Sequence, residues 1–190
     1  MSKRYSVSTY RGIDLTLFAV ILILLESLII RVASGPVFRD QAFTVSLAAA
    51  VTSIVFIRWG YWGGIHAALA GLVLCIFSGA SLSQYAVYGI GNLFSLVMVP
   101  FVRKAGPEKM LQSKFLCLLT GLGVWLLMQF GRSVIALILG SGWSDVLRFF
   151  TTDSLSAVFT VVILWIARRL DGICEDQLHY LKRVSRETDE

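Results

Sequence analysis

The sequence predicts an all-α integral membrane protein, built as one membrane domain of six transmembrane helices. Its 190 residues are 56% hydrophobic and 15% charged, whereas soluble domains carry about 25% charged residues. The mean hydropathy is +0.75, and the apolar residues come in long continuous blocks rather than in amphipathic stripes. We therefore expect nearly the whole chain to lie in the bilayer, with no soluble catalytic domain beside it.

The first half of the chain predicts three helices, at about 14–32, 42–57 and 61–79. The first block is too long for the apolar region of a signal peptide, about 7–15 residues, and it contains Glu26, so we expect it to be a retained helix. The turn between the second and third helices carries the sequence RWGYWGG. Spanning needs about 20 mostly apolar residues. The second and fourth helices are short, and the third and fourth are rich in glycine, so these three are expected to be broken, tilted or partly re-entrant.

The second half predicts three more helices, at about 85–102, 114–139 and 150–168. The fourth helix ends near Pro100 and, like the second, is short. The segment from 169 to 190 is polar and is expected to be a cytoplasmic tail. Cys174, Leu178 and Leu181 are spaced to form one apolar stripe of a short helix, which would lie on the membrane or contact a partner. A solvated tail is the alternative.

The distribution of Lys and Arg predicts the orientation. If the N-terminus is inside, the inner side collects most of the 17 basic residues, and the outer side only Arg31, Arg39 and Arg148. Short cytoplasmic loops carry such an excess. Both termini are therefore expected to be cytoplasmic, in a cell membrane.

Polar residues at membrane depth gather in the outer half and predict a binding pocket open to the outside. Arg132 is the most informative of them, because a charge at the bilayer centre costs roughly 2.5–3.5 kcal/mol and usually faces the protein interior or water. We expect the loops at 33–41 and 140–149 to act as a lid. An ion pair between Glu26 and Arg132 that only stabilises the bundle is the alternative. The candidate substrate-binding residues are Glu26, Tyr85, Tyr88, Asn92, Gln129, Arg132 and Trp143.

The sequence gives little support for an enzyme or a metal site. FSGAS superficially resembles a serine elbow at Ser81, but neither His66, in the opposite half of its helix, nor His179, in the tail, is placed to act as its base. His66 lies among small residues and is expected to be structural. The cysteines fall in separate segments and are expected to be isolated thiols: Cys75, Cys117 and Cys174.

The third predicted helix carries two rows of small residues at four-residue spacing, which lets helix backbones approach closely. Such rows serve either packing within the bundle or docking of another membrane protein. The first row is Gly60, Gly64 and Ala68, and the second is Gly63, Ala67 and Gly71. The chain has no nucleotide-binding motif, so energy for uphill transport would come from a partner or an ion gradient.

The whole chain resembles the substrate-binding S component of an energy-coupling factor (ECF) vitamin transporter. The resemblance rests on the third helix, FIRWGYWGGIHAALAGLVLCIFSG, the fourth, YGIGNLFSLVMVPFVRK, and a basic loop before a long fifth helix. It implies a prokaryotic plasma-membrane subunit that takes a vitamin from outside and works with a transmembrane coupling protein and two cytosolic ATPases. Members of the family dock through an AxxxA face on the first helix. Here that spacing gives Ala19, Ile23 and Ser27, which leaves open whether the first or the third helix docks.

Among S components, the chain is most similar to the cobalamin-specific ones. The resemblance implies cobalamin or a corrinoid precursor as the ligand, with no cofactor of the protein's own. A corrinoid's amides and phosphate would suit Asn92, Gln129 and an arginine. Three alternatives remain: an S component for folate, pantothenate or a queuosine precursor, a secondary transporter driven by protons through Glu26, and a structural subunit without a ligand.

Overall fold

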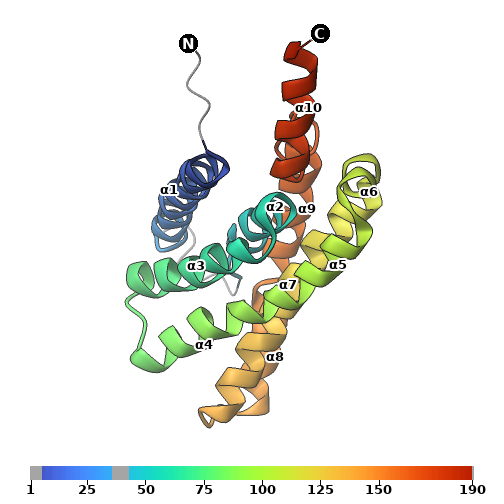
Figure 1. The fold of residues 1–190 in the computed structure, drawn as a ribbon. Coiled ribbons are helices and arrows are strands. Elements are labelled where there is room, and N and C mark those ends of the chain that lie inside the picture. Colours follow the sequence, from blue (N-terminus) through green and yellow to red (C-terminus); the bar gives the residue numbers. More distant parts are fainter. Residues whose placement is uncertain (1–5, 36–42, 190) are drawn as a thin grey trace.

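A computed structural model gives the fold of residues 6–35 and 43–189, and within these residues it consists of helices and their connections (Figure 1). Two 3-10 turns, η1 (Gly60–Trp62) and η2 (Leu93–Val97), interrupt the helical runs. The helices are α1 (Val7–Ala33), α2 (Ala48–Trp59), α3 (Gly63–Ser78), α4 (Leu82–Asn92), α5 (Met98–Ala105), α6 (Pro107–Gln112), α7 (Lys114–Ile138), α8 (Trp143–Thr152), α9 (Ser154–Ala167) and α10 (Gln177–Asp189).

Five helical runs in the described part of the chain are long and apolar enough to cross a membrane: Val7–Ala33, Ala48–Ser78, Leu82–Ala105, Lys114–Ile138 and Trp143–Ala167. The predicted class, an all-helical chain with helices of membrane-spanning length, is thereby confirmed. The predicted number of six spans is not confirmed, because α2 and α3 together form one of the five runs. α2 has 12 residues and is about 18 Å long at 1.5 Å per residue, less than a hydrocarbon core of about 30 Å.

The chain nevertheless turns where the RWGYWGG segment predicted a turn. Gly60 ends α2 with φ +61°, a left-handed conformation that glycine adopts without steric cost. Three residues on, Gly63 packs against α2, since a Cβ there would lie 2.4 Å from the ring of Phe56. α2 and α3 are therefore two helices in close contact.

The small residues of α3 pack against other elements of the same chain. A Cβ at Gly64 would lie 3.0 Å from Leu96, and one at Gly71 only 2.3 Å from the carbonyl oxygen of Tyr88, so α3 runs antiparallel to α4 and η2 beside it (Figure 1). Gly60, Gly63, Gly64, Ala67 and Gly71 are all buried, whereas Ala68 and Ala19 are half-buried. The five buried positions form no exposed docking surface, and packing within the bundle is their observed use.

The last long run begins earlier than predicted, because the expected 140–149 loop is mostly helix α8. In this helix Val146 is buried, whereas the charged side chains of Asp145 and Arg148 are exposed. Asp145 lies in its first turn, where a carboxylate stabilises the positive end of the helix dipole. The other loop predicted to act as a lid, 33–41, lies from residue 36 onward outside the described residues.

One end of the bundle is held together by the buried side chain of Arg58. Its Nε and Nη2 donate to the carboxylate of Asp14 on α1 at 2.9 and 2.6 Å, and its Nη1 donates to the carbonyl oxygens of Gly172 and, at 3.1 Å, Ile173. The start of α1 and the segment that leads to α10 therefore lie at the same end of the molecule (Figure 1). His66 lies nearer this end, with its Nε2 3.0 Å from the carbonyl oxygen of Leu15.

The segment after α9 differs from the predicted apolar stripe. Cys174 is buried before α10 begins and lies near Cys117 of α7 in the same buried cluster, so these two cysteines are neighbours rather than isolated. Leu178, by contrast, is 49% exposed. The tail is anchored by the buried carboxylate of Glu175, which accepts from His179 Nδ1 at 3.0 Å and Arg183 Nη2 at 2.9 Å.

The anchor at Glu175 predicts that α10 detaches in acid. Burial alone would raise the pKa of Glu175, but the hydrogen bonds from Arg183 and His179 outweigh it and hold this pKa below its usual value. A lowered carboxyl pKa stabilises the folded tail above the unfolded value, about 4.3, and this stabilisation is lost as the pH falls through the folded pKa. Hydrogen exchange, corrected for intrinsic rates, should therefore show protection of residues 177–184 at pH 7 and its loss in acid, once the pH falls below the lowered pKa of Glu175.

The matched variants are Glu175→Gln and Asp171→Asn, since Asp171 contacts the same Arg183 at 3.0 Å but has a side chain that is 74% exposed. Glu175→Gln should remove the protection at pH 7, and Asp171→Asn should leave most of it. Equal protection of wild type at pH 7 and in acid would contradict the anchor.

Candidate functional site

A buried ion pair lies in the end of the bundle opposite to Arg58. Arg132 on α7 is 4% exposed and Asp153, between α8 and α9, is 5% exposed, and Nη1 of Arg132 lies 3.1 Å from Oδ2 of Asp153. The sequence left an ion pair with Glu26 as an alternative role for Arg132, but the carboxylate that pairs with Arg132 in the structure is that of Asp153. Asp153 is the carboxylate that the packing of α7 against α9 brings to the arginine.

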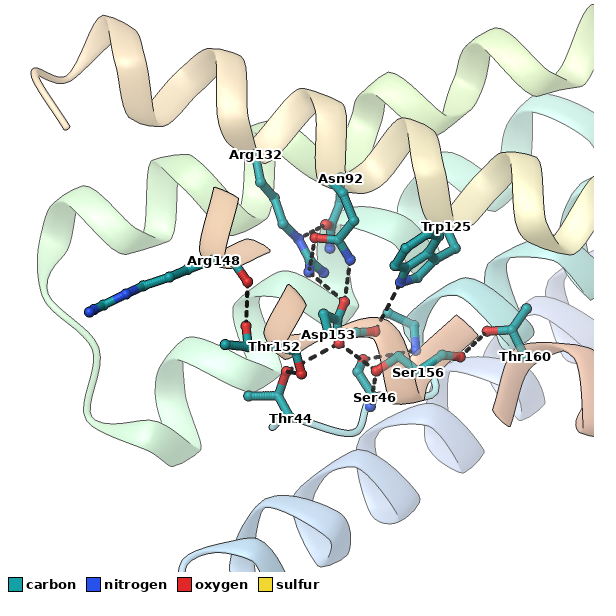
Figure 2. A network of polar contacts seen from close by, with 12 residues as sticks. Thr44, Ser46, Asn92, Trp125, Arg132, Arg148, Thr152, Asp153, Ser156 and Thr160 are labelled. Atoms are coloured by element: carbon teal, nitrogen blue, oxygen red, sulfur yellow. Dashed lines mark hydrogen bonds and ion pairs between the residues drawn. The ribbon is translucent and has the colours of Figure 1, made fainter. Parts of the chain in front are cut away.

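Asp153 accepts hydrogen bonds from side chains of three segments (Figure 2). Gln129 Nε2 and Ser156 Oγ donate to its carboxylate, and Thr44 Oγ1 donates to Oδ1 at 3.2 Å. Trp125 Nε1 donates to its backbone carbonyl at 3.1 Å. These donors and Arg132 together surround the carboxylate of Asp153 and fix its position beside the arginine.

Arg132 is held in one orientation by its other neighbours. Nε donates to Oδ1 of Asn92 on α4 at 2.8 Å, and Nη1 also reaches Oε1 of Gln129 at 3.2 Å. Asn92 is itself fixed, because its Nδ2 donates to the carbonyl oxygen of Ala67 at 2.9 Å. The guanidinium carbon lies 4.8 Å from the centre of the Tyr88 ring, a cation–π distance.

Two glycines allow this geometry. A Cβ at Gly131 would lie 2.1 Å from the carbonyl oxygen of Gly91, and a Cβ at Gly91 would lie 2.7 Å from the Cα of Arg132. Real side chains do not approach backbone atoms so closely, so α4 and α7 are in backbone contact at this point. The residues that follow the two glycines, Asn92 and Arg132, are thereby placed next to each other.

Glu26 has a different role from the predicted one. It is 0% exposed, and its Oε2 accepts the backbone N–H of Leu47 at 2.8 Å. Oε1 has no hydrogen-bond partner among the described residues. Leu47 precedes the first residue of α2, so the carboxyl group of α1 binds the free N–H end of α2, where a carboxylate is favourable.

A cavity of about 250 Å³ lies beside the ion pair. Its lining includes Leu74, Gln84, Tyr88, Phe149 and Arg132, and the rings of Tyr88 and Phe149 meet edge to face at 6.1 Å. Nη2 of Arg132 makes no hydrogen bond with any residue that the structure describes. The cavity therefore combines an aromatic wall with Arg132, whose fixed guanidinium has one nitrogen, Nη2, without a partner among the described residues.

The structure sorts the predicted site residues into three groups. Tyr88 and Arg132 line the cavity, whereas Asn92 and Gln129, both 0% exposed, hold the arginine from behind. Glu26, Tyr85 and Trp143 are not among the lining residues. Trp143 is 73% exposed, because it begins α8 and points away from the bundle core.

Sequence reasoning missed the role of Asp153 and the contribution of Gln84 to the cavity. A signal for Asp153 existed, since it is the only acidic residue between positions 146 and 170 and begins the last apolar block. The position of Gln84 at the cavity was not predicted. Its Oε1 accepts the N–H of Ser81 at 2.8 Å, so the residue also caps the start of α4. Arg148, from an expected outer loop, points away from the network (Figure 2).

No family model matches the chain, and no match was found among curated proteins or among solved structures.

Proposed function

We propose that the chain is the solute-binding membrane subunit of a multi-subunit importer, of the S-component type. In this proposal the chain makes six passes through a prokaryotic plasma membrane, with both termini in the cytoplasm, and the cavity beside Arg132 takes a vitamin-sized solute from the outside. The observation that carries the proposal is the unused nitrogen of Arg132 at a cavity with an aromatic wall. Binding sites typically combine apolar walls with a few fixed polar groups.

The buried network would give the site its preorganisation. Asp153, Asn92 and Gln129 hold the guanidinium before a ligand arrives, so little rotamer entropy is lost when it binds. Because the oxygens of Asp153, Asn92 and Gln129 accept hydrogen bonds from Nε and Nη1 of Arg132 only, a carbonyl, amide or anionic oxygen of a solute would complete the hydrogen bonding. Tyr88 and Phe149 would contact its apolar part.

Cobalamin or a corrinoid precursor is the ligand that the sequence resemblance favours. A corrinoid is larger than a drug-sized ligand, whose pockets measure roughly 300–1,000 Å³, and the cavity measures about 250 Å³. Binding of a corrinoid would thus require the cavity to widen, and α8 is the element to move, since it contributes Phe149 and Thr152 to the wall. The volume itself favours a second candidate, a smaller vitamin such as pantothenate or folate.

The proposed partners are a transmembrane coupling protein and two cytosolic ATPases. The buried glycines of α3 leave α1 as the better docking helix, where half-buried Ala19 lies beside the exposed side chains of Leu17 and Val20. Uptake that persisted after deletion of the ATPases would instead favour the proton-driven transporter.

Filling the cavity tests the site without disturbing the ion pair. Leu74 is half-buried in the wall, and Leu74→Trp should occupy the space and weaken solute binding at least tenfold. Ile76 on the same helix is 61% exposed, so Ile76→Trp is the matched control and should bind like wild type.

The probes are cyanocobalamin, folate and pantothenate, each added to the detergent-purified chain, and the readouts are the melting temperature and equilibrium dialysis. One of them should stabilise wild type and Ile76→Trp but not Leu74→Trp. If no probe binds wild type, or if Leu74→Trp binds as tightly as wild type, the cavity is not the site.

A further inference from the structure

A second cavity, of about 280 Å³, lies at the other end of the bundle and has no part in the proposed solute site. It is formed where α1, the η1 turn, α5 and the start of α10 meet. Its lining carries three arginines, Arg11, Arg58 and Arg103, together with two tryptophans. This concentration of guanidinium groups around one cavity requires an explanation.

Two of the three arginines have no carboxylate partner in the described part of the chain. Arg58 is committed to Asp14 and to backbone carbonyls. Arg11 lies 4.5 Å from the ring centre of Trp62, and Arg103 lies 4.8 Å from that of Tyr61, while no ion pair joins either of them to a described residue. A guanidinium stacked on a ring keeps the N–H groups on its edge available.

The η1 turn is built to present both arginines. Tyr61 and Trp62 are consecutive residues of η1, so the two stacked guanidinium groups are brought to one turn from α1 and α5. Gly60 precedes them with φ +61°, and a Cβ there would lie 2.9 Å from Nη2 of Arg103. Any larger residue would be strained by this φ and would displace Arg103.

One carboxylate, Asp176, also lines the cavity. Its Oδ1 accepts the backbone N–H of His179 at 3.0 Å, which places it at the start of α10. With Arg58 and Asp14 neutralising each other, Arg11 and Arg103 outweigh Asp176. The cavity therefore keeps a positive balance and favours an anion.

We propose that this cavity binds the phosphate group of an anionic lipid headgroup. Phosphate oxygens match the paired N–H donors of guanidinium groups, and basic pockets between transmembrane helices bind anionic headgroups. Tyr61 and Trp62 are 51% and 44% exposed, and such aromatic side chains are enriched at the depth of headgroups. The exposed side chain of Leu178 beside the cavity offers an apolar contact to the start of an acyl chain.

The test is native mass spectrometry of the full chain, delipidated and then titrated with phosphatidylglycerol or phosphatidylcholine. Wild type should retain phosphatidylglycerol in preference to phosphatidylcholine. Each basic residue near an anionic headgroup contributes about 1 kcal/mol, which is roughly a fivefold change in affinity. Arg103→Gln should therefore weaken phosphatidylglycerol binding about fivefold, and Arg11→Gln/Arg103→Gln should weaken it by well over tenfold.

Arg31→Gln is the matched control, because Arg31 also lies over an aromatic ring, Phe77 at 5.8 Å, but outside this cavity. It should bind like wild type, and all variants should keep the wild-type melting temperature. Competition by millimolar inorganic phosphate identifies a site for free phosphate and overturns the lipid assignment. Equal retention of phosphatidylglycerol by wild type and the double variant overturns the site itself.

Discussion

Asp153→Ala is expected to destabilise the protein by about 3–5 kcal/mol, because it leaves the guanidinium of Arg132 buried without its counter-ion. The side chain of Arg132 is 5% exposed, so water replaces the lost carboxylate poorly. Gln129, Thr44 and Ser156 lose their common acceptor at the same time. Asp145→Ala is the control, since Asp145 is exposed on α8 and should change stability by less than about 0.5 kcal/mol.

The double variant Arg132→Met/Asp153→Ala should be more stable than Asp153→Ala alone, because neither charge then remains buried. A double-mutant cycle of these substitutions, measured by reversible unfolding in detergent, gives the coupling between the two side chains. We expect a coupling of at least about 2 kcal/mol, within the range for residues in one network. Additive effects would mean that the two side chains do not stabilise the fold through their mutual interaction.

Gly131→Ala is expected to have the second large effect, a loss of about 3 kcal/mol. The new Cβ would lie 2.1 Å from the carbonyl oxygen of Gly91 and 2.7 Å from Phe94, and a backbone atom cannot move aside as a flexible side chain does. α4 and α7 would have to separate, and overpacked sites cost typically 1–3 kcal/mol, occasionally more. The separation would also pull Asn92 away from Arg132.

Gly12→Ala is the matched control for this substitution. Gly12 is also in a helix, and a Cβ there meets nothing within 4 Å. The change should leave stability unaltered or raise it by roughly 0.5–1 kcal/mol, the helix preference of alanine over glycine. A Gly131→Ala protein with the same melting temperature as wild type would contradict the backbone contact between α4 and α7.

Hydropathy predicted the helical runs because the length and the apolar content of each segment can be read directly from the sequence. It missed α8, whose residues WSDVLRFFTT include polar side chains between the apolar ones, so that the segment resembles a loop. It also gave no means to tell whether α2 and α3 each cross, since a glycine turn divides one long apolar run into two shorter helices.

The partner of Arg132 could not be predicted because the sequence does not contain the register between helices. Glu26 and Asp153 both carry a carboxylate in or beside a predicted helix, and either would have balanced the charge. The structure assigns Glu26 to the N–H of Leu47, which leaves Asp153 for the arginine. Likewise, the small residues of α3 indicated a close contact but not whether the contact lies inside or outside the chain.

The most direct test of the proposed site is equilibrium binding of cyanocobalamin, folate and pantothenate to wild type and to folded Arg132→Met/Asp153→Ala. The double variant keeps the aromatic wall of the cavity but removes the guanidinium. If Arg132 contacts the solute through its unused nitrogen, the dissociation constant of the bound probe should rise at least tenfold, which corresponds to about 1.4 kcal/mol. An unchanged dissociation constant in a variant that melts cooperatively would show that Arg132 only holds the bundle together.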